Sequence, residues 1–153
     1  MIKELTTQSP KTFIAFLRGI NVGGKNKIAM ADLRDSFEIW GFSNIATFLA
    51  SGNICFDSSL KSAEEIRQTI EKGIKKSFGL EIQTMARSLE DLKRLAARAP
   101  FFDYPVPDDI RFYMSFLGSP NSTSLEIPFK SPGGGLEIPL VIEGEVFSMV
   151  RLS

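Results

Sequence analysis

The residues best suited to binding chemistry lie in one short basic segment, residues 18–27, which reads RGINVGGKNK. It carries three cations and no acidic side chain. Because glycine adopts positive φ angles freely, a Gly-Gly pair can turn successive backbone amides toward one point and form an anion-binding nest. The segment therefore predicts a site for a small anion such as a phosphate group. The candidate residues are Arg18, Asn21, Gly23, Gly24, Lys25 and Lys27.

Residues 19–25 also fit the spacing of a phosphate-binding P-loop, GxxxxGK. A P-loop continues with Ser or Thr, whose hydroxyl binds Mg²⁺, whereas Asn26 follows here. The helical pattern begins only at Met30, well after the lysine. We therefore exclude a P-loop and keep two interpretations: a site for a generic anion, or a simple strand-to-helix connection with solvated lysines.

A second polar motif, Ser51-Gly52-Asn53, separates two short strand-like runs. Its structural interpretation is a tight hairpin, with glycine and asparagine where positive φ is needed. Its functional interpretation is that Ser51 and Asn53 offer neutral hydrogen bonds to a ligand. Whether this turn lies near the basic segment depends on strand order, which the sequence does not determine.

Composition excludes several kinds of site. The chain has no histidine and one cysteine, Cys55, which rules out Ser-His and Cys-His nucleophiles, His-ligated metals and an internal disulfide. An oxygen-ligand Mg²⁺ site is the one metal chemistry that remains open. We expect no metal and no cofactor, and we find no catalytic constellation.

The charge balance bears on partners. Eighteen basic and 18 acidic residues cancel, which argues against a nucleic-acid partner. The first ten residues contain no apolar signal segment, and no run approaches the length of a membrane span. We expect a cytoplasmic protein with no membrane partner.

The hydrophobic periods define the elements that would position these residues. An apolar run at 12–18 reads as a central strand, and Met30, Leu33, Phe37 and Trp40 recur at helical spacing. Two short strands follow at 44–50 and 54–57. A capping box at Ser62 opens a second helix, and 80–86 reads as another strand. The order βαββαβ predicts a ferredoxin-like subdomain over 12–87.

The remaining residues, 88–153, predict a second α+β subdomain. Ser88-x-x-Asp91 starts a helix, 111–117 reads as a strand, and 136–142 and 146–152 form a last strand pair. The order βαββαβ also occurs in RNA-recognition domains, which stack bases on aromatic side chains exposed on one face of the sheet. Phe13 and Phe16 point to opposite faces of the first strand, which argues against that function.

Residues 17–56 read LRGINVGGKNKIAMADLRDSFEIWGFSNIATFLASGNICF. This stretch closely resembles the family called domain of unknown function 1697. The match rests on LRGINVGG, Met30, Leu33-Arg34, Gly41-Phe42, the Ser-Gly-Asn turn and Phe56. The resemblance implies an α+β fold of two related subdomains, the first ferredoxin-like, and it implies no activity. Family members typically continue past the end of this sequence, so we expect the second subdomain to be incomplete at its C-terminus.

Three functional hypotheses remain open. The first is a binding module for a small anion or phosphorylated ligand, using residues 18–27. The second is an interaction protein or homodimer that pairs through a sheet edge. The third is an enzyme acting on a phosphorylated metabolite through the same loop, whose general base would have to be a carboxylate or a lysine.

Overall fold

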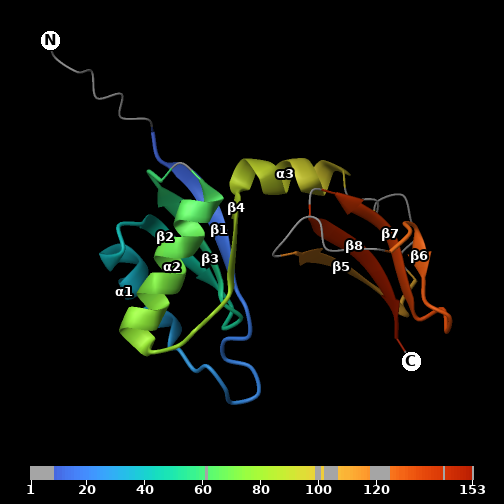
Figure 1. Cartoon of the computed structure of the whole chain (residues 1–153), viewed down its shortest axis with the longest axis horizontal. Helices are drawn as coiled ribbons and strands as arrows, with labels where there is room; N and C mark the ends of the chain where they lie inside the picture. The colour runs from blue at the N-terminus through green and yellow to red at the C-terminus, as the bar shows by residue number, and fades with distance from the viewer. Residues whose placement is uncertain are drawn as a thin grey trace, which may run out of the picture. The chain divides into compact units, whose positions relative to one another are not determined.

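The computed structural model describes residues 9–60, 62–98, 101, 107–117, 125–142 and 144–152. The chain divides into two compact units, Met1–Lys93 and Arg94–Ser153. Each unit contains one four-stranded antiparallel sheet (Figure 1). The α+β class is confirmed. The subdomain boundaries drawn from the sequence, 12–87 and 88–153, stay a prediction.

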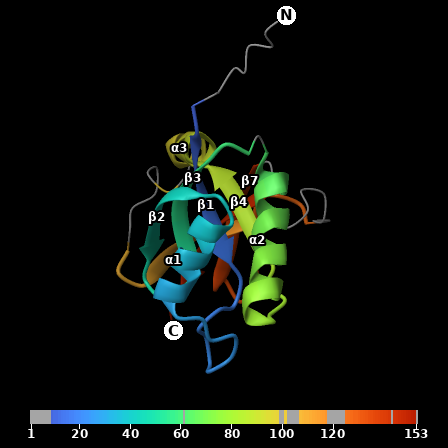
Figure 2. The same cartoon turned by 90° about the vertical axis from the view of Figure 1, so that its left-hand side faces the viewer.

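The first unit has the βαββαβ order expected from the sequence. Its elements are β1 (Lys11–Leu17), α1 (Met30–Ile39), β2 (Ser43–Phe48), β3 (Asn53–Ser58), α2 (Ala63–Phe78) and β4 (Thr84–Ser88). The sheet order is β2-β3-β1-β4 with every neighbouring pair antiparallel, which is the ferredoxin-like arrangement. Both helices cover one face of this sheet (Figure 2). The last strand begins at Thr84, so residues 80–83 form a connection instead of the start of a strand.

The core of the first unit lies between the sheet and the two helices. Along β1, Phe13, Ala15 and Leu17 are buried, because side chains alternate between the two faces of a strand. Aromatic rings pack against one another in this core, where the ring centroids of Phe42 and Phe56 are 4.6 Å apart. Alternation along one central strand thus provides the buried face on which both helices pack.

Local signals fix the ends of α2. The Ser62 side chain accepts a hydrogen bond from the Glu65 amide, and the Glu65 carboxylate accepts one from the Ser62 amide, completing the predicted capping box. Gly79, with φ of 69°, ends the helix in the left-handed conformation. Within the helix, the absence of a side chain at Gly73 makes room for the ring of Trp40.

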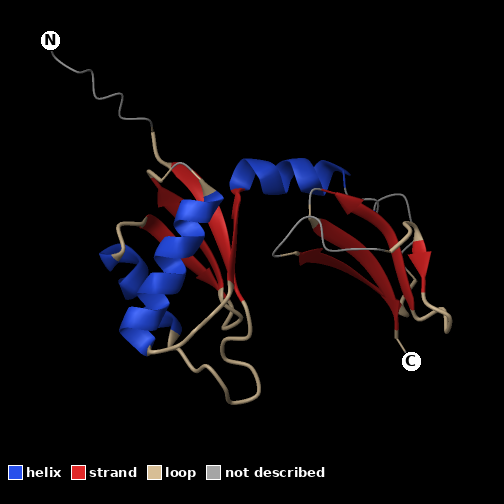
Figure 3. Cartoon of the chain, in the orientation of Figure 1, coloured by secondary structure: helices blue, strands red, loops and turns tan. Residues whose placement is uncertain are grey.

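The second unit repeats part of the strand pairing of the first, and Figure 3 shows the strands of both units in red. Its strands are β5 (Ile110–Phe116), β6 (Phe129–Lys130), β7 (Leu136–Ile142) and β8 (Glu145–Arg151), in the order β5-β8-β7-β6; α3 (Leu89–Arg98) spans the division between the units. The β7–β8 hairpin places β8 beside β5, just as the β2–β3 hairpin places β3 beside β1. This shared strand pairing relates the two units. The expected incompleteness at the C-terminus stays a prediction.

Aromatic packing covers one face of the second sheet. The Phe101 ring lies 4.7 Å from Phe112 on β5 and 5.5 Å from Phe147 on β8, measured between ring centroids. Phe147 and Met149 are buried on this face. Among the described residues, no helix is both long and apolar enough to cross a membrane.

Candidate functional site

The basic segment after β1 folds into a miniature hairpin. The Asn21 amide donates to the Asn26 carbonyl over 3.1 Å, and the Lys25 amide donates to the Val22 carbonyl over 3.1 Å. The two residues at its tip, Gly23 and Gly24, have φ angles of 58° and 76°. Positive φ at both central positions is the requirement of a type I′ turn, the tightest hairpin connection.

This turn gives a structural reason for both glycines. Successive amides in a turn can also converge to form an anion-binding nest. Gly23 and Gly24 are both left-handed, and the side chains of Lys25 and Lys27 are exposed. The glycines are therefore explained by the turn, and anion binding at the tip stays a prediction.

Asn21 holds the base of the hairpin in place. Its side-chain nitrogen donates to the carbonyls of Ile28 (2.9 Å) and Ala50 (3.1 Å), and its oxygen accepts from the Ile28 amide (2.9 Å). Its φ of 55° lies in the left-handed region, which asparagine tolerates better than most residues. Asn21 therefore acts as a structural clamp, with both polar atoms of its side chain occupied by the backbone.

The Ser-Gly-Asn turn lies against the same loop. The sequence alone left open whether these two motifs are close in space. β1 and β3 run antiparallel, so the end of β1 lies beside the start of β3, and the Leu17 amide donates to the Gly52 carbonyl over 2.9 Å. A Cβ at Gly52 would stand 2.8 Å from the Ile20 side chain. The two motifs thus pack together at one end of the first unit.

The two polar side chains of the Ser-Gly-Asn turn are engaged locally. The Ser51 hydroxyl donates to the Phe48 carbonyl (3.3 Å) and accepts from the side-chain nitrogen of Asn53 (3.2 Å). This supports the hairpin interpretation of Ser51 and Asn53, and their contact with a ligand stays a prediction. Next to them, Val22, Phe48 and Leu49 expose 65%, 71% and 75% of their surface.

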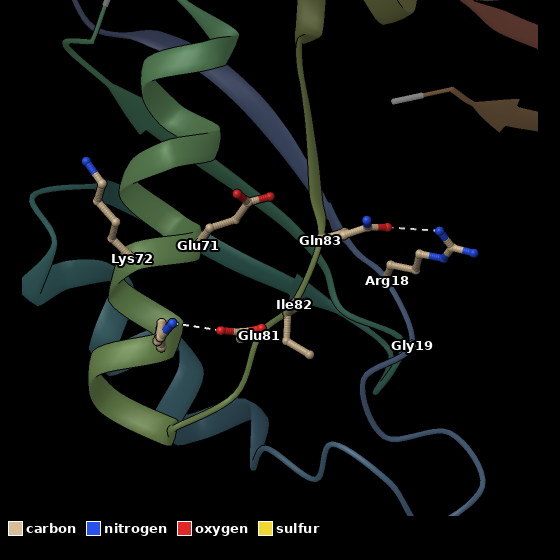
Figure 4. A pocket seen from close by; sticks show the side chains of 8 residues that line it. Arg18, Gly19, Glu71, Lys72, Glu81, Ile82 and Gln83 are labelled. Atoms are coloured by element: carbon tan, nitrogen blue, oxygen red, sulfur yellow. Dashed lines mark hydrogen bonds and ion pairs between the residues drawn. The ribbon is translucent and has the colours of Figure 1, made fainter. Parts of the chain in front are cut away.

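A cavity of about 680 Å³ opens at the base of the loop (Figure 4). Its lining comes from the end of β1, the second half of α2 and the connection before β4: Arg18, Gly19, Glu71, Lys72, Lys75, Glu81, Ile82 and Gln83. The volume falls within the range of small-molecule sites, about 300–1,000 Å³. Of the candidates named from the sequence, only Arg18 reaches this cavity.

Arg18 is fixed beside the cavity by a neutral partner. Its guanidinium donates to the Gln83 side-chain oxygen over 2.9 Å, and its amide donates to the Gln83 carbonyl over 3.0 Å. Figure 4 shows Arg18 beside Gln83 and Lys72 on α2, with the charged ends of the two side chains pointing away from one another. Neither cation has an acidic partner within the described part of the chain.

Both carboxylates of the cavity are already paired. Glu81 accepts from Lys75 over 2.7 Å, and Glu71 accepts from Arg67 over 2.6 Å and from the Thr84 amide over 2.9 Å. The hydrogen bond and charge of Lys75 hold the pKa of Glu81 below its ordinary value, and Glu81 raises the pKa of Lys75. The cavity therefore retains two cations whose charge no carboxylate offsets.

Sequence reasoning found Arg18 and missed Lys72 and Gln83. The one signal for Lys72 was its three-residue spacing from Lys75, which places both on one side of a helix. Gln83 carried no signal, because its contact with Arg18 spans 65 residues.

Other reactive groups give no catalytic centre among the described residues. Burial, followed by the charge of Asp57, raises the pKa of the half-buried Cys55 thiol, which opposes formation of a reactive thiolate. No cluster of three Cys, Asp or Glu side chains that could hold a metal ion occurs in the described ranges.

The fold and the loop-base cavity define an α+β protein built from a ferredoxin-like unit and a second unit with related strand pairing. The chain belongs to the family described as protein of unknown function (DUF1697), which matches residues 11–147. No curated protein matches it.

Among solved structures, the chain is similar to the conserved bacterial protein SP0830 from Streptococcus pneumoniae. The TM-score is 0.70 at 19% sequence identity, and the alignment covers 95% of this chain and 79% of that chain. At this identity the similarity shows the fold alone.

Proposed function

We propose that the first unit binds a small anionic ligand, such as a phosphorylated metabolite, in the cavity at the base of the Gly-rich loop. The observation that carries the proposal is that Arg18 and Lys72, which have no carboxylate partner in the described part of the chain, both belong to the lining of a cavity of ligand size. Hydrogen bonds from charged donors to phosphate are roughly twice as strong as neutral ones.

The arrangement favours an anion for a second reason. Gln83 holds the Arg18 backbone and guanidinium together, so part of the ordering cost of binding is met before the ligand arrives. Lys75 pairs with Glu81 through side chains that are 68% and 80% exposed. Exposed ion pairs are weak, so a doubly charged ligand can compete with Glu81 for Lys75.

A second cavity in the same unit suits an anion less well. It measures about 520 Å³ and is lined by Lys11 and Lys93 together with Glu90 and Asp91. Its two carboxylates match its two lysines, so it offers no excess positive charge. The loop-base cavity is therefore the better site for a negatively charged ligand.

An enzyme acting on a phosphorylated metabolite would use the same cavity, whose described lining offers the carboxylates Glu71 and Glu81. The lowered pKa of Glu81 makes it a weak base, and Glu71 is committed to Arg67 and the Thr84 amide. These contacts favour binding over catalysis.

The proposal is tested by titrating the protein with inorganic phosphate, pyrophosphate and a panel of nucleotides, followed by NMR of the backbone amides. We expect the largest shifts at Gly19, Ile82 and Gln83, and an affinity that falls with salt because the cations are exposed. The Arg18→Met, Lys72→Met double variant should weaken binding at least about tenfold, since each hydrogen bond to a charged group contributes about 1.5–3 kcal/mol.

The matched control is the Lys25→Met, Lys27→Met double variant, which removes the same charge from the exposed hairpin. Its affinity should stay within about threefold, because the variant loses only a long-range attraction that salt largely screens. If the control loses binding and the cavity variant keeps it, the site is the hairpin and the cavity proposal is wrong. Absence of any amide shift with every anion would also refute it.

A further inference from the structure

The two carboxylates in the lining of the loop-base cavity are held very differently. Glu71 accepts hydrogen bonds from Arg67 over 2.6 Å and from the Thr84 amide over 2.9 Å, and its side chain is 28% exposed. Glu81 accepts from Lys75 over 2.7 Å, and its side chain is 80% exposed. Because a single exposed ion pair is weak, another anion can displace Glu81, whereas Glu71 is a fixed part of the wall.

Lys75 lies on the same side of α2 as Lys72, since residues three apart on a helix are neighbours. Both lysines line the cavity. Glu81 reaches Lys75 from the connection that follows Gly79, and Figure 4 shows its carboxylate directed at α2. The helix therefore offers two ammonium groups to the cavity, and one of them holds a carboxylate of the same chain.

We infer that Glu81 occupies the position of the ligand's charged group, and that a phosphate monoester takes its place on Lys75 when it binds. The inference rests on the proposed function and names the ligand class for the same cavity. Carboxylate and phosphoryl oxygens accept hydrogen bonds from ammonium groups in the same way. Near neutral pH a phosphate monoester carries close to two negative charges and three acceptor oxygens, so it can accept from both lysines of α2.

A doubly charged group is favoured because the displacement of Glu81 has a cost. Binding at Lys75 breaks one ion pair to form another, so a ligand with one charge gains little there. Such a ligand leaves Glu81 in place and contacts the cations that have no carboxylate partner, Arg18 and Lys72. The cavity, at about 680 Å³, also has room for the organic part of an ester, because its volume lies within the range of small-molecule sites.

Lys75 also has a simpler explanation, which the experiment has to separate from ligand binding. Lys75 and Lys76 both lie in the last turn of α2, where basic side chains complement the helix dipole. Lys76 is exposed and does not belong to the described lining of the cavity. If Lys75 serves only the helix, the two lysines should behave alike. If Lys75 holds the ligand, its replacement alone should change binding.

The experiment is calorimetric titration of the full chain at about pH 8 with methyl phosphate, which carries close to two charges, and dimethyl phosphate, which carries one. Methyl phosphate should bind at least about tenfold more tightly, since it alone gains the bonds to Lys75. Glu81→Gln should tighten the binding of methyl phosphate at least about threefold, because no carboxylate then competes for Lys75.

The Lys75→Met, Glu81→Gln double variant removes the ion pair without changing the net charge. It should weaken methyl phosphate binding at least about tenfold and leave dimethyl phosphate within about twofold of the natural protein. Its matched control is the Lys76→Met, Glu38→Gln double variant, which removes one lysine and one glutamate outside the described lining. Both ligands should bind this control within about twofold of the natural protein.

The outcomes separate this inference from the proposed function. If neither phosphate binds, the proposed function fails and the inference fails with it. If both bind, the inference alone is overturned by a Glu81→Gln variant that binds methyl phosphate no more tightly than the natural protein. A Lys75→Met, Glu81→Gln variant that keeps the full preference for methyl phosphate also overturns it. Inorganic phosphate that binds more tightly than methyl phosphate would assign the site to the free ion and overturn the ester.

Discussion

The side-chain nitrogen of Asn21 donates a hydrogen bond to the carbonyl of Ala50 over 3.1 Å, joining two loops that lie 29 residues apart. The same side chain bonds the amide and carbonyl of Ile28. One asparagine therefore links the exit of β1, the approach to α1 and the β2–β3 turn. The end of the first unit that carries the candidate site depends on this link.

Replacing Asn21 with alanine should destabilise the first unit by at least about 2 kcal/mol. The change removes these hydrogen bonds, worth about 0.5–1.5 kcal/mol each, and places alanine in the left-handed region at a cost of about 1–2 kcal/mol. Urea denaturation followed by the fluorescence of Trp40, the single tryptophan, measures the loss.

Asn21→Gly separates the two causes, because glycine relieves the backbone cost while the hydrogen bonds stay lost. It should be more stable than Asn21→Ala and less stable than the natural protein. Val22→Ala, at an exposed neighbour, is the control for a change in the same loop. Equal stability of Asn21→Ala and Val22→Ala would contradict the clamp.

Gly73→Ala should lower stability, although the same change inside a helix ordinarily raises it by up to about 1 kcal/mol. A Cβ at Gly73 would stand 2.3 Å from Cε2 of Trp40, so the indole has to move out of its packed position. Overpacking of this kind costs about 1–3 kcal/mol. The measurement is the urea midpoint, read from Trp40 fluorescence.

Two variants sharpen this test. Lys76→Ala, on the exposed side of α2, should change the midpoint little. Trp40→Phe should make Gly73→Ala less harmful than it is in the natural protein, because the smaller ring leaves room for a methyl group. Since Trp40 is the single tryptophan, the urea midpoints of these variants are read from far-UV circular dichroism. A Gly73→Ala protein that is more stable than the natural one would show that the indole does not occupy this space.

Glu64 should titrate far below an ordinary glutamate. Hydrogen bonds from Arg67, and secondarily from Gln68, lower its pKa from 4.5 to about 2. Because the folded-state pKa is depressed, the stabilisation is fully present above pH 4.5 and is lost as the pH falls toward 2. NMR titration of the side-chain carboxyl carbon gives the value directly.

The order of the two causes is testable with single variants. Arg67→Met should raise the pKa of Glu64 more than Gln68→Ala does, since Arg67 makes the larger contribution. It should also flatten the acid side of the stability profile between pH 4.5 and 2. A larger effect from Gln68→Ala would mean that the neutral amide dominates.

The sequence by itself determined the elements of this protein wherever the signal was local. The βαββαβ order followed from hydrophobic periods, and the start of α2 followed from Ser62 and Glu65, three residues apart. The last hairpin was also found, since 136–142 and 146–152 correspond to β7 and β8. These features depend on interactions between residues a few positions apart, so a short stretch of sequence is enough to predict them.

Only the tertiary structure decided how distant residues meet. Antiparallel pairing of β1 with β3 brought Gly52 against Ile20, and pairing of β1 with β4 brought Gln83 to Arg18. The positive φ angles at Gly23 and Gly24 form a tight hairpin turn, and anion binding there stays a prediction. The cavity arises from strand order, which depends on packing across the whole unit and leaves no pattern in any one segment.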